Sequence, residues 1–292
     1  MYDIADYYEA DTVAEACGLL QKHPDAVLIC GGSDVLIRIR EGRLAGSSLI
    51  SIREIKELCS VSMDADGTIS IGAAVTFHHL SKDPVVRKYI PVLSEAVDQV
   101  GGPQIRNVGT IGGNLCNGAV SADSAPACFC LDARLQICGP DGERVIPIKD
   151  FYLGPGRVDL RPKELLTHIL IDREHYEGYT GHYIKYAMRN AMDIAALSCC
   201  VMCRADLFSQ KLEDVRIAFG VAAPTPIRCR ETEAKLKGMS LDKDLYSIIE
   251  QSVRGEINPR DSWRASRSFR IQIGGEIARR ALQRAVEFQE VR

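Results

Sequence analysis

Residues 104–115 read Gln-Ile-Arg-Asn-Val-Gly-Thr-Ile-Gly-Gly-Asn-Leu. This segment combines three glycines within five residues with a hydroxyl and amide side chains, and it carries a single charge, on Arg106. Long polar loops inside a compact domain tend to be functional. This segment and the residues that follow it to Ala122 therefore predict one long loop, 104–122, that binds a polar ligand.

A second glycine segment lies upstream, in Val27-Leu-Ile-Cys-Gly-Gly-Ser-Asp34. An apolar run ends at Gly31-Gly32, and a short helix is expected to start at Asp34. Backbone N–H groups exposed in such a turn form an anion-binding concavity, which a following helix strengthens. A Gly-Gly pair after a strand is also often only a turn, and the GxGxxG dinucleotide fingerprint is absent. Together, the two segments could hold one diphosphate from two sides.

The bulk composition is that of an ordinary globular protein. The 292 residues are 46% hydrophobic and 26% charged, with a formal net charge of -3. A general nucleic-acid binder would show a basic surplus, and no stretch approaches the roughly 18 apolar residues of a transmembrane helix. The acidic start, with Asp3, is unlike a signal peptide. We expect a cytoplasmic protein of about two domains that binds neither nucleic acid nor membrane.

The eleven cysteines show no closely paired metal-site spacing. They are expected to pack as small hydrophobic residues. No segment groups them as plant-type 2Fe-2S clusters require. If the protein works with iron and sulfur, another chain is expected to supply them. The two loose groups are Cys116, Cys128, Cys130 and Cys138, and then Cys199, Cys200 and Cys203.

The apolar pattern predicts an α+β chain. Two hairpins are expected, at 58–71 around Asp64-Ala-Asp-Gly67 and at 134–148 around Gly139-Pro-Asp-Gly142. A composition shift near 176–182 predicts a domain boundary, giving domains 1–176 (subdomains about 1–55 and 56–176) and 177–292. The other expected elements are helices at 12–20, 92–100 and 266–286 and strands at 26–30, 49–52, 183–186, 195–204 and 215–221.

Both glycine segments, together with Ser121-Ala-Asp123, resemble the FAD-binding subunits of molybdenum hydroxylases, most closely those of bacterial xanthine dehydrogenases. Residues 185–195, Lys-Tyr-Ala-Met-Arg-Asn-Ala-Met-Asp-Ile-Ala, resemble the start of that family's C-terminal domain, like that of carbon monoxide dehydrogenase flavoproteins. The resemblance covers nearly the whole chain. It implies a vanillyl-alcohol-oxidase-like (PCMH-type) FAD-binding fold of two α+β subdomains, followed by a three-stranded sheet with helices.

The resemblance also implies non-covalent FAD, with no catalytic residue and no metal ligand in this chain. Val100 stands where xanthine dehydrogenases often have an aromatic residue over the cofactor, so that stacking contact is not expected here. Leu166 would pack nearby, with Leu165 as the alternative. The implied FAD-binding residues are Val27, Leu28, Ile29, Cys30, Gly31, Gly32, Ser33, Asp34, Val100, Gly109, Thr110, Ile111, Gly112, Gly113, Asn114, Asp123, Leu166 and Lys185.

Simpler roles exist for some of these residues. Asp123 would cap a helix that starts near residue 124, or it would accept hydrogen bonds from cofactor hydroxyls. Lys185 would be a solvated side chain or a cofactor contact. Arg189 and Asp193 are expected to form an ion pair. The adjacent histidines at 78–79, which could suggest covalent flavin, are expected on the surface.

The resemblance implies an electron-transfer subunit. Electrons would pass from 2Fe-2S clusters on a partner chain through FAD to NAD⁺, while a molybdenum-cofactor subunit oxidises hypoxanthine or xanthine in purine salvage. The implied assembly is a heterotrimer or a dimer of such heterotrimers. Alternatives are the FAD subunit of another molybdenum hydroxylase, for carbon monoxide or an aromatic or aldehyde substrate, and a flavin-free structural subunit. The relative with an extra iron–sulfur cluster is disfavoured, because no long cysteine-bearing insertion is present.

Overall fold

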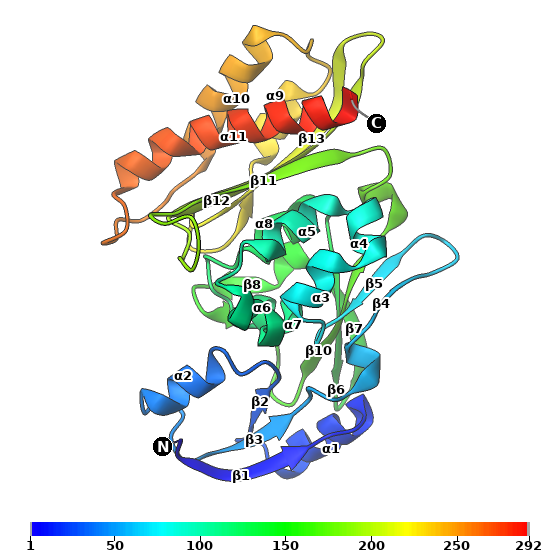
Figure 1. The fold of residues 1–292 in the computed structure, drawn as a ribbon, viewed down its shortest axis with the longest axis vertical. Helices are drawn as coiled ribbons and strands as arrows, with labels where there is room; N and C mark the ends of the chain where they lie inside the picture. The colour runs from blue at the N-terminus through cyan, green and yellow to red at the C-terminus, as the bar shows by residue number, and fades with distance from the viewer. Residues whose placement is uncertain (1, 291–292) are drawn as a thin grey trace.

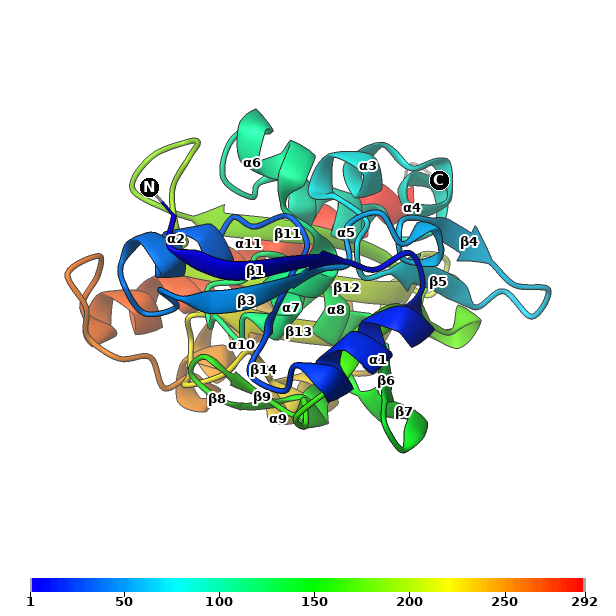
Figure 2. The ribbon, with the colours of Figure 1, turned by 90° about the horizontal axis from the view of Figure 1, so that it is seen from below.

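The computed structural model describes residues 2–290. The chain forms three parts stacked along its long axis, here called the N-terminal, middle and C-terminal parts (Figure 1). The N-terminal part is a parallel sheet of order β1-β3-β2. Figure 2 shows this sheet from below, with helices α1 and α2 towards opposite ends. Its elements are β1 (Ile4–Glu9), α1 (Val13–Lys22), β2 (Val27–Ile29), α2 (Val35–Arg40) and β3 (Ser47–Ser51).

The local sequence signals predict the helices and strands of the N-terminal part correctly, with the exception of strand β1. Thr12 caps α1 by accepting a hydrogen bond from the backbone N–H of Glu15 at 3.1 Å, and a short helix follows the first Gly-Gly turn. Strand β1 was not predicted. Its sequence, Ile-Ala-Asp-Tyr-Tyr-Glu, lacks an apolar run because it is an edge strand with mostly exposed residues.

The middle part contains a five-stranded antiparallel sheet of order β4-β5-β10-β6-β7. Both predicted hairpins are confirmed, since they form the outer strand pairs of this sheet. The central strand β10 was not predicted. The strands are β4 (Val61–Met63), β5 (Ile69–Gly72), β6 (Arg134–Gly139), β7 (Gly142–Pro147) and β10 (Leu165–Ile171), with a small pair β8 (Tyr152–Gly154) and β9 (Arg157–Val158) beside them.

Short helices, α3 to α8, complete the middle part, as Figure 1 shows. Two of them correct the prediction of a long loop at 104–122, because Pro103 starts α6 and Thr110 caps α7. Proline suits the first helical position, since its missing N–H has no partner there in any case. The helices are α3 (Phe77–Lys82), α4 (Pro84–Tyr89), α5 (Pro91–Asp98), α6 (Pro103–Val108), α7 (Ile111–Cys116) and α8 (Ser124–Cys130).

The C-terminal part is an antiparallel sheet of order β11-β12-β13-β14 with three helices. The prediction of three strands was one short, because the two-residue strand β14 pairs with the end of β13. Two residues are too few to produce an alternation that a sequence could show. The elements are β11 (Thr180–Tyr186), β12 (Leu197–Asp206), β13 (Lys211–Gly220), β14 (Ile227–Arg228), α9 (Arg230–Leu236), α10 (Lys243–Glu256) and α11 (Arg267–Glu290).

Strand β12 is apolar on both faces because both faces are covered. Cys200 and Met202 belong to the core of the middle part, whereas Cys199, Val201 and Cys203 pack under the C-terminal helices. All three cysteines are buried. They fill space as small hydrophobic residues, as the sequence predicts.

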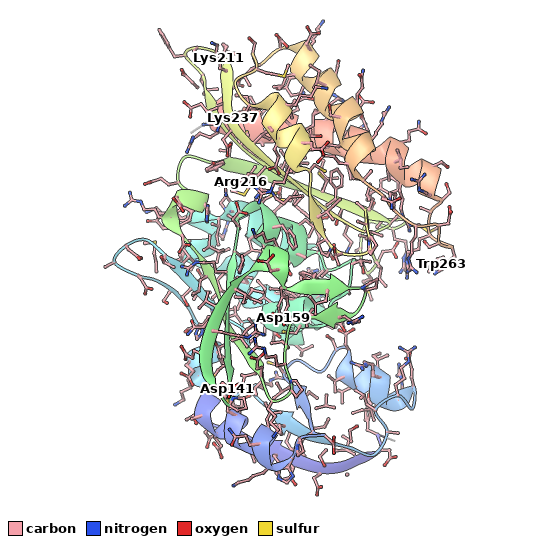
Figure 3. All side chains as sticks on the ribbon, turned by 180° about the vertical axis from the view of Figure 1, so that it is seen from behind. Asp141, Asp159, Lys211, Arg216, Lys237 and Trp263 are labelled. Carbon is pink, nitrogen blue, oxygen red and sulfur yellow. The ribbon has the colours of Figure 1, made fainter. Side chains whose placement is uncertain are left out.

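An ionic cluster joins the middle and C-terminal parts. Asp132, just after α8, contacts Arg228 at 2.9 Å, Arg230 at 3.2 Å and Arg216 at 3.5 Å. Arg216 also donates to the carbonyl oxygen of Cys130 at 3.0 Å, and it lies between the two parts in Figure 3. Burial raises the pKa of Asp132, but the charge and hydrogen bonds of Arg228, together with the charges of Arg216 and Arg230, outweigh burial and leave that pKa below its usual value. The carboxylate is therefore held ionised at the junction.

Among the helices of residues 2–290, none is long and apolar enough to cross a membrane.

We predict that Asp132→Ala destabilises the chain by roughly 2 kcal/mol, because it leaves two largely buried guanidinium groups without a shared carboxylate. The side chain of Asp132 is 30% exposed, so the loss should be smaller than for a fully buried pair. Urea unfolding measures the change. Asp141→Ala, in the exposed turn between β6 and β7 (Figure 3), is the control and should stay within about 0.5 kcal/mol of wild type. Equal effects of the two variants would contradict the role of the cluster.

Candidate functional site

A cavity of about 460 Å³ lies between the N-terminal and middle parts, and we call it the main cavity. Both glycine segments line it, together with apolar side chains from several elements. Leu166 and its alternative Leu165, of which one was expected near the ligand, both line the main cavity. The predicted site residues found in its wall are Val27, Leu28, Cys30, Gly31, Gly32, Ser33, Asp34, Val100, Thr110, Gly112, Gly113, Asn114 and Leu166.

Several predicted residues do not line the main cavity. Ile29 and Ile111 are buried behind its wall, and Gly109 lies between α6 and α7. Asp123 and Lys185 lie outside it as well. Conversely, sequence reasoning missed further lining residues. Some lie inside or directly beside the two glycine segments: Val35, Arg38, Ile105, Cys116 and Asn117. The others come from elsewhere in the chain: Ile52, Ala73, Phe77 and Leu160.

The two glycine segments touch each other beside the main cavity. A Cβ atom on Gly31 would lie 1.9 Å from the carbonyl oxygen of Val108, at the end of α6. No side chain fits there, so only glycine allows this approach. A polar bridge also joins the segments, since Nδ2 of Asn117 donates to Oδ1 of Asp34 at 3.1 Å.

The backbone N–H groups of the second segment are already occupied. Those of Ile111 and Gly112 donate to the carbonyl oxygens of Val75 at 3.1 Å and Ala73 at 2.9 Å. Those of Gly113 and Asn114 donate to Thr110, to its side chain at 3.2 Å and its carbonyl oxygen at 3.0 Å. This segment therefore shapes the main cavity without offering these donors to a ligand.

The first segment is different. Within residues 2–290, the N–H groups of Gly32, Ser33 and Asp34 donate to no group of the chain. Gly32 has a positive φ of 71°, which turns the chain from β2 into α2. A run of free N–H groups just before a helix is suited to an anion.

Ser124 orients a side chain of the main cavity and was not predicted as a site residue. This fully buried serine donates through Oγ to Oδ1 of Asn114 at 2.6 Å. The bond occupies the amide oxygen of Asn114 and leaves its Nδ2 available. The sequence carried no signal for this pairing, because a serine at the first position of a helix is ordinary.

Asp123 and Lys185 form a buried ion pair of 2.8 Å, with each side chain 7% exposed. Tyr183 donates to the other oxygen of Asp123 at 2.7 Å, and Lys185 also donates to the carbonyl oxygen of Gln99 at 2.9 Å. Asp123 makes no capping hydrogen bond to α8, so the simpler readings of a helix cap and of a solvated lysine are both wrong. Burial raises the pKa of Asp123, and the adjacent Lys185 opposes the shift.

A smaller, polar cavity of about 340 Å³ adjoins this pair, and we call it the loop cavity. Its wall consists of Gln99, Lys185 and the loop of residues 186–193. Gln99 lines the loop cavity and its neighbour Val100 lines the main cavity, so the two cavities lie close to a shared stretch of chain. The predicted ion pair of Arg189 and Asp193 is confirmed at 3.6 Å; it closes this loop.

The main cavity carries neutral thiols. Burial raises the pKa of Cys30 to about 11 and that of Cys116 to about 12. His78 and His79 lie exposed on α3, as predicted, and do not line the main cavity. In residues 2–290, no group of three or more His, Cys, Asp or Glu side chains is placed to hold a metal ion.

Two protein-family descriptions match the chain. "FAD binding domain in molybdopterin dehydrogenase" matches residues 2–172, and "CO dehydrogenase flavoprotein C-terminal domain" matches residues 182–285. The chain is also 40% identical to the xanthine dehydrogenase FAD-binding subunit of Escherichia coli O157:H7, over 98% of this chain and 97% of that protein. It is 28% identical to the glyceraldehyde dehydrogenase medium chain of Sulfolobus acidocaldarius, over 91% and 93% of the two chains.

The fold is similar to that of a chain in the solved carbon monoxide dehydrogenase of Hydrogenophaga pseudoflava. The TM-score is 0.92 at 27% identity, covering 98% of this chain and 99% of the other. This likeness confirms the predicted α+β fold of an FAD-binding unit followed by a C-terminal sheet with helices.

Adjacent glycines of α7 provide a matched test of this geometry. A Cβ on Gly112 would lie 2.5 Å from Cβ and 2.6 Å from the oxygen of Ala73, whereas one on Gly113 would meet only the Thr110 hydroxyl, at 3.0 Å. We predict that Gly112→Ala lowers stability by about 1–3 kcal/mol through overpacking. Gly113→Ala should be nearly neutral, because the gain in helix propensity offsets the small shift of Thr110. Urea unfolding measures both, and a more destabilised Gly113→Ala would refute the arrangement.

Proposed function

The chain belongs to the FAD-binding subunits of the molybdenum hydroxylases, and on that premise we propose that the main cavity binds FAD without a covalent bond. The observation that carries this proposal is the run of free N–H groups at Gly32, Ser33 and Asp34 in the cavity wall. A diphosphate is the part of FAD that such donors recognise.

The lining of the main cavity suits the rest of the cofactor. Its size lies within the range of about 300–1,000 Å³ that is common for ligand pockets. Apolar side chains such as Leu28, Phe77 and Leu166 face the cavity and would pack on the flat ring systems. Arg38, at the end of α2, adds a positive charge, and the oriented amide of Asn114 adds a donor.

The chain's own residues bind and orient the cofactor in this proposal. The bound FAD would accept electrons from one partner and deliver them to an acceptor. Asp123, which lies outside the main cavity, would accept hydrogen bonds from cofactor hydroxyls that extend beyond that cavity, through the lone pairs that Tyr183 and Lys185 leave available. Lys185 would hold Gln99 and so the position of Val100 in the cavity wall. The full set of FAD-binding residues given above remains a prediction.

We further propose that the complete enzyme is a xanthine dehydrogenase. A molybdenum-cofactor subunit would oxidise hypoxanthine or xanthine, 2Fe-2S clusters on another subunit would carry the electrons, and NAD⁺ would be the final acceptor. Support comes from the 40% identity to the Escherichia coli protein. The choice of NAD⁺, the heterotrimer, the role in purine salvage and the cytoplasmic location rest on family resemblance. The two-domain division at 176/177 is part of the same proposal.

A second candidate is the FAD subunit of a different molybdenum hydroxylase. The similarity to a glyceraldehyde dehydrogenase medium chain and to a carbon monoxide dehydrogenase chain supports it, since the substrate would be selected on the molybdenum subunit. A flavin-free structural subunit is less well supported, because the main cavity and its free N–H groups are present.

We predict that the purified chain is yellow and releases FAD on acid precipitation. Gly113→Val should lower FAD affinity at least about tenfold, because the added side chain enters the main cavity and an overlap of this kind costs roughly 1–3 kcal/mol. Titration with FAD, followed by flavin fluorescence, measures the affinity. Gly255→Val, at a glycine of α10 with open space around it, is the control and should bind FAD normally. Normal binding by Gly113→Val would place the FAD site elsewhere, and a colourless chain that takes up no FAD would refute the proposal.

We predict that the complete complex reduces NAD⁺ when xanthine or hypoxanthine is supplied without oxygen. NADH absorbance measures the reaction, and omitting the purine is the control. If purine oxidation requires oxygen, the proposal that NAD⁺ is the electron acceptor is wrong. If only an aldehyde or another heterocycle is oxidised, the proposal of a purine substrate is wrong, and the FAD subunit of a different molybdenum hydroxylase is favoured.

A further inference from the structure

Two cysteines on different parts of the chain have their thiols in contact. Cys17 lies on the buried face of α1, in the N-terminal part, and is 8% exposed. Cys138 lies on β6, in the middle part, and is partly exposed. Their sulfur atoms are 3.6 Å apart although 121 positions separate them in the chain.

This thiol pair lies where the two parts join behind the main cavity. Cys17 shares a hydrophobic cluster with Ile52 and Leu165, and Cys138 packs against that cluster. Cys138 is also the cross-strand partner of Leu165. Ile52 and Leu165 both line the main cavity. A change at the thiol pair would therefore act on the joint between the cavity's two sides.

We propose that Cys17 and Cys138 are a reversible modification site, which hydrogen peroxide oxidises to a disulfide that clamps the N-terminal part to the middle part. A disulfide needs the sulfur atoms to approach from 3.6 Å to about 2.05 Å. Neither cysteine takes part in the proposed binding of FAD.

The contact also sets the order of the reaction. Cys17 donates its S–H to the sulfur of Cys138, and burial together with this hydrogen bond raises the pKa of Cys17 to about 12. Cys17 is therefore held as a thiol. The sulfur of Cys138, which is more exposed, is the nucleophile that reacts first with peroxide.

The step is balanced with peroxide as the two-electron oxidant. The sulfur of Cys138 attacks one oxygen of the peroxide and the O–O bond breaks. The other oxygen departs as water with the thiol proton, and Cys138 becomes a sulfenic acid. The sulfur of Cys17 then attacks that sulfur, the S–S bond forms, the S–O bond breaks, and a second water leaves with the remaining protons. Two thiols and one peroxide give one disulfide and two waters. A dithiol then reduces this disulfide back to two thiols by exchange and is itself oxidised to a disulfide.

The disulfide would limit opening of the main cavity. A cross-link between residues far apart in the chain constrains the unfolded and partly opened states. In the FAD-bound protein, whose existence rests on the proposed function, the oxidised form should therefore release FAD more slowly than the reduced form.

The first measurement is peptide mapping of the purified native complex after hydrogen peroxide treatment, without a reductant. A cross-linked pair of peptides containing Cys17 and Cys138, two hydrogens lighter than the free pair, is expected. Cys17→Ser and Cys138→Ser should each abolish it. Cys59→Ser should retain it, because that thiol belongs to the same cluster but donates to the carbonyl oxygen of Arg53. Oxidation of Cys138 to a sulfinic acid with no cross-link would overturn the proposal.

The second measurement concerns the clamp. FAD release should become several-fold slower after oxidation, return to the original rate with dithiothreitol, and be unaffected by peroxide in Cys17→Ser. An unchanged rate of FAD release in cross-linked protein would overturn the proposal that the disulfide clamps the two parts together. Oxidation should also raise the urea midpoint of the flavin-free chain, and an unchanged midpoint would overturn the clamp even if the chain binds no FAD. Failure of FAD binding and failure of this proposal are thus distinguishable.

Discussion

The contact between the backbone of Gly31 and the end of α6 is the constraint on which the arrangement of the main cavity depends. With only a hydrogen at Cα, the turn after β2 approaches the carbonyl of Val108 more closely than any side chain would allow. The approach seats the N-terminal sheet against the middle part. It leaves the following N–H groups free on one side of the resulting cavity, while the donors of α7 are consumed in building the other side.

The C-terminal part matters to the cavity because it holds α8 at both ends. At the first end, Tyr183 and Lys185 of β11 bind Asp123. At the other end, Arg216 and Arg228 bind the backbone and carboxylate around Asp132. Ser124, the first residue of α8, in turn fixes the amide of Asn114 in the cavity wall. A domain that contributes no lining to the main cavity thus sets the position of one of its donors.

Local signals were enough for part of the fold. The two hairpins form as predicted because a turn motif and two adjacent apolar runs specify them within about a dozen residues. Strand β10 lies between these hairpins in the sheet but belongs to neither of them, and its pairing depends on contacts that no local pattern reports. The polar segment 104–122 was misjudged as a loop. Its glycines suggest flexibility, yet Gly112 is there to let α7 pack on Ala73.

The sequence by itself determined the family, the α+β class and the two glycine segments. These depend on short motifs, and the residue types in such motifs indicate which backbone conformation each motif needs. The tertiary structure decided which residues meet. It paired Asp123 with Lys185 instead of leaving one as a helix cap and the other in solvent, and it brought Cys17 against Cys138. Such pairings join residues 60 or more positions apart. They follow from the packing of whole elements, which the order of residues along the chain does not display.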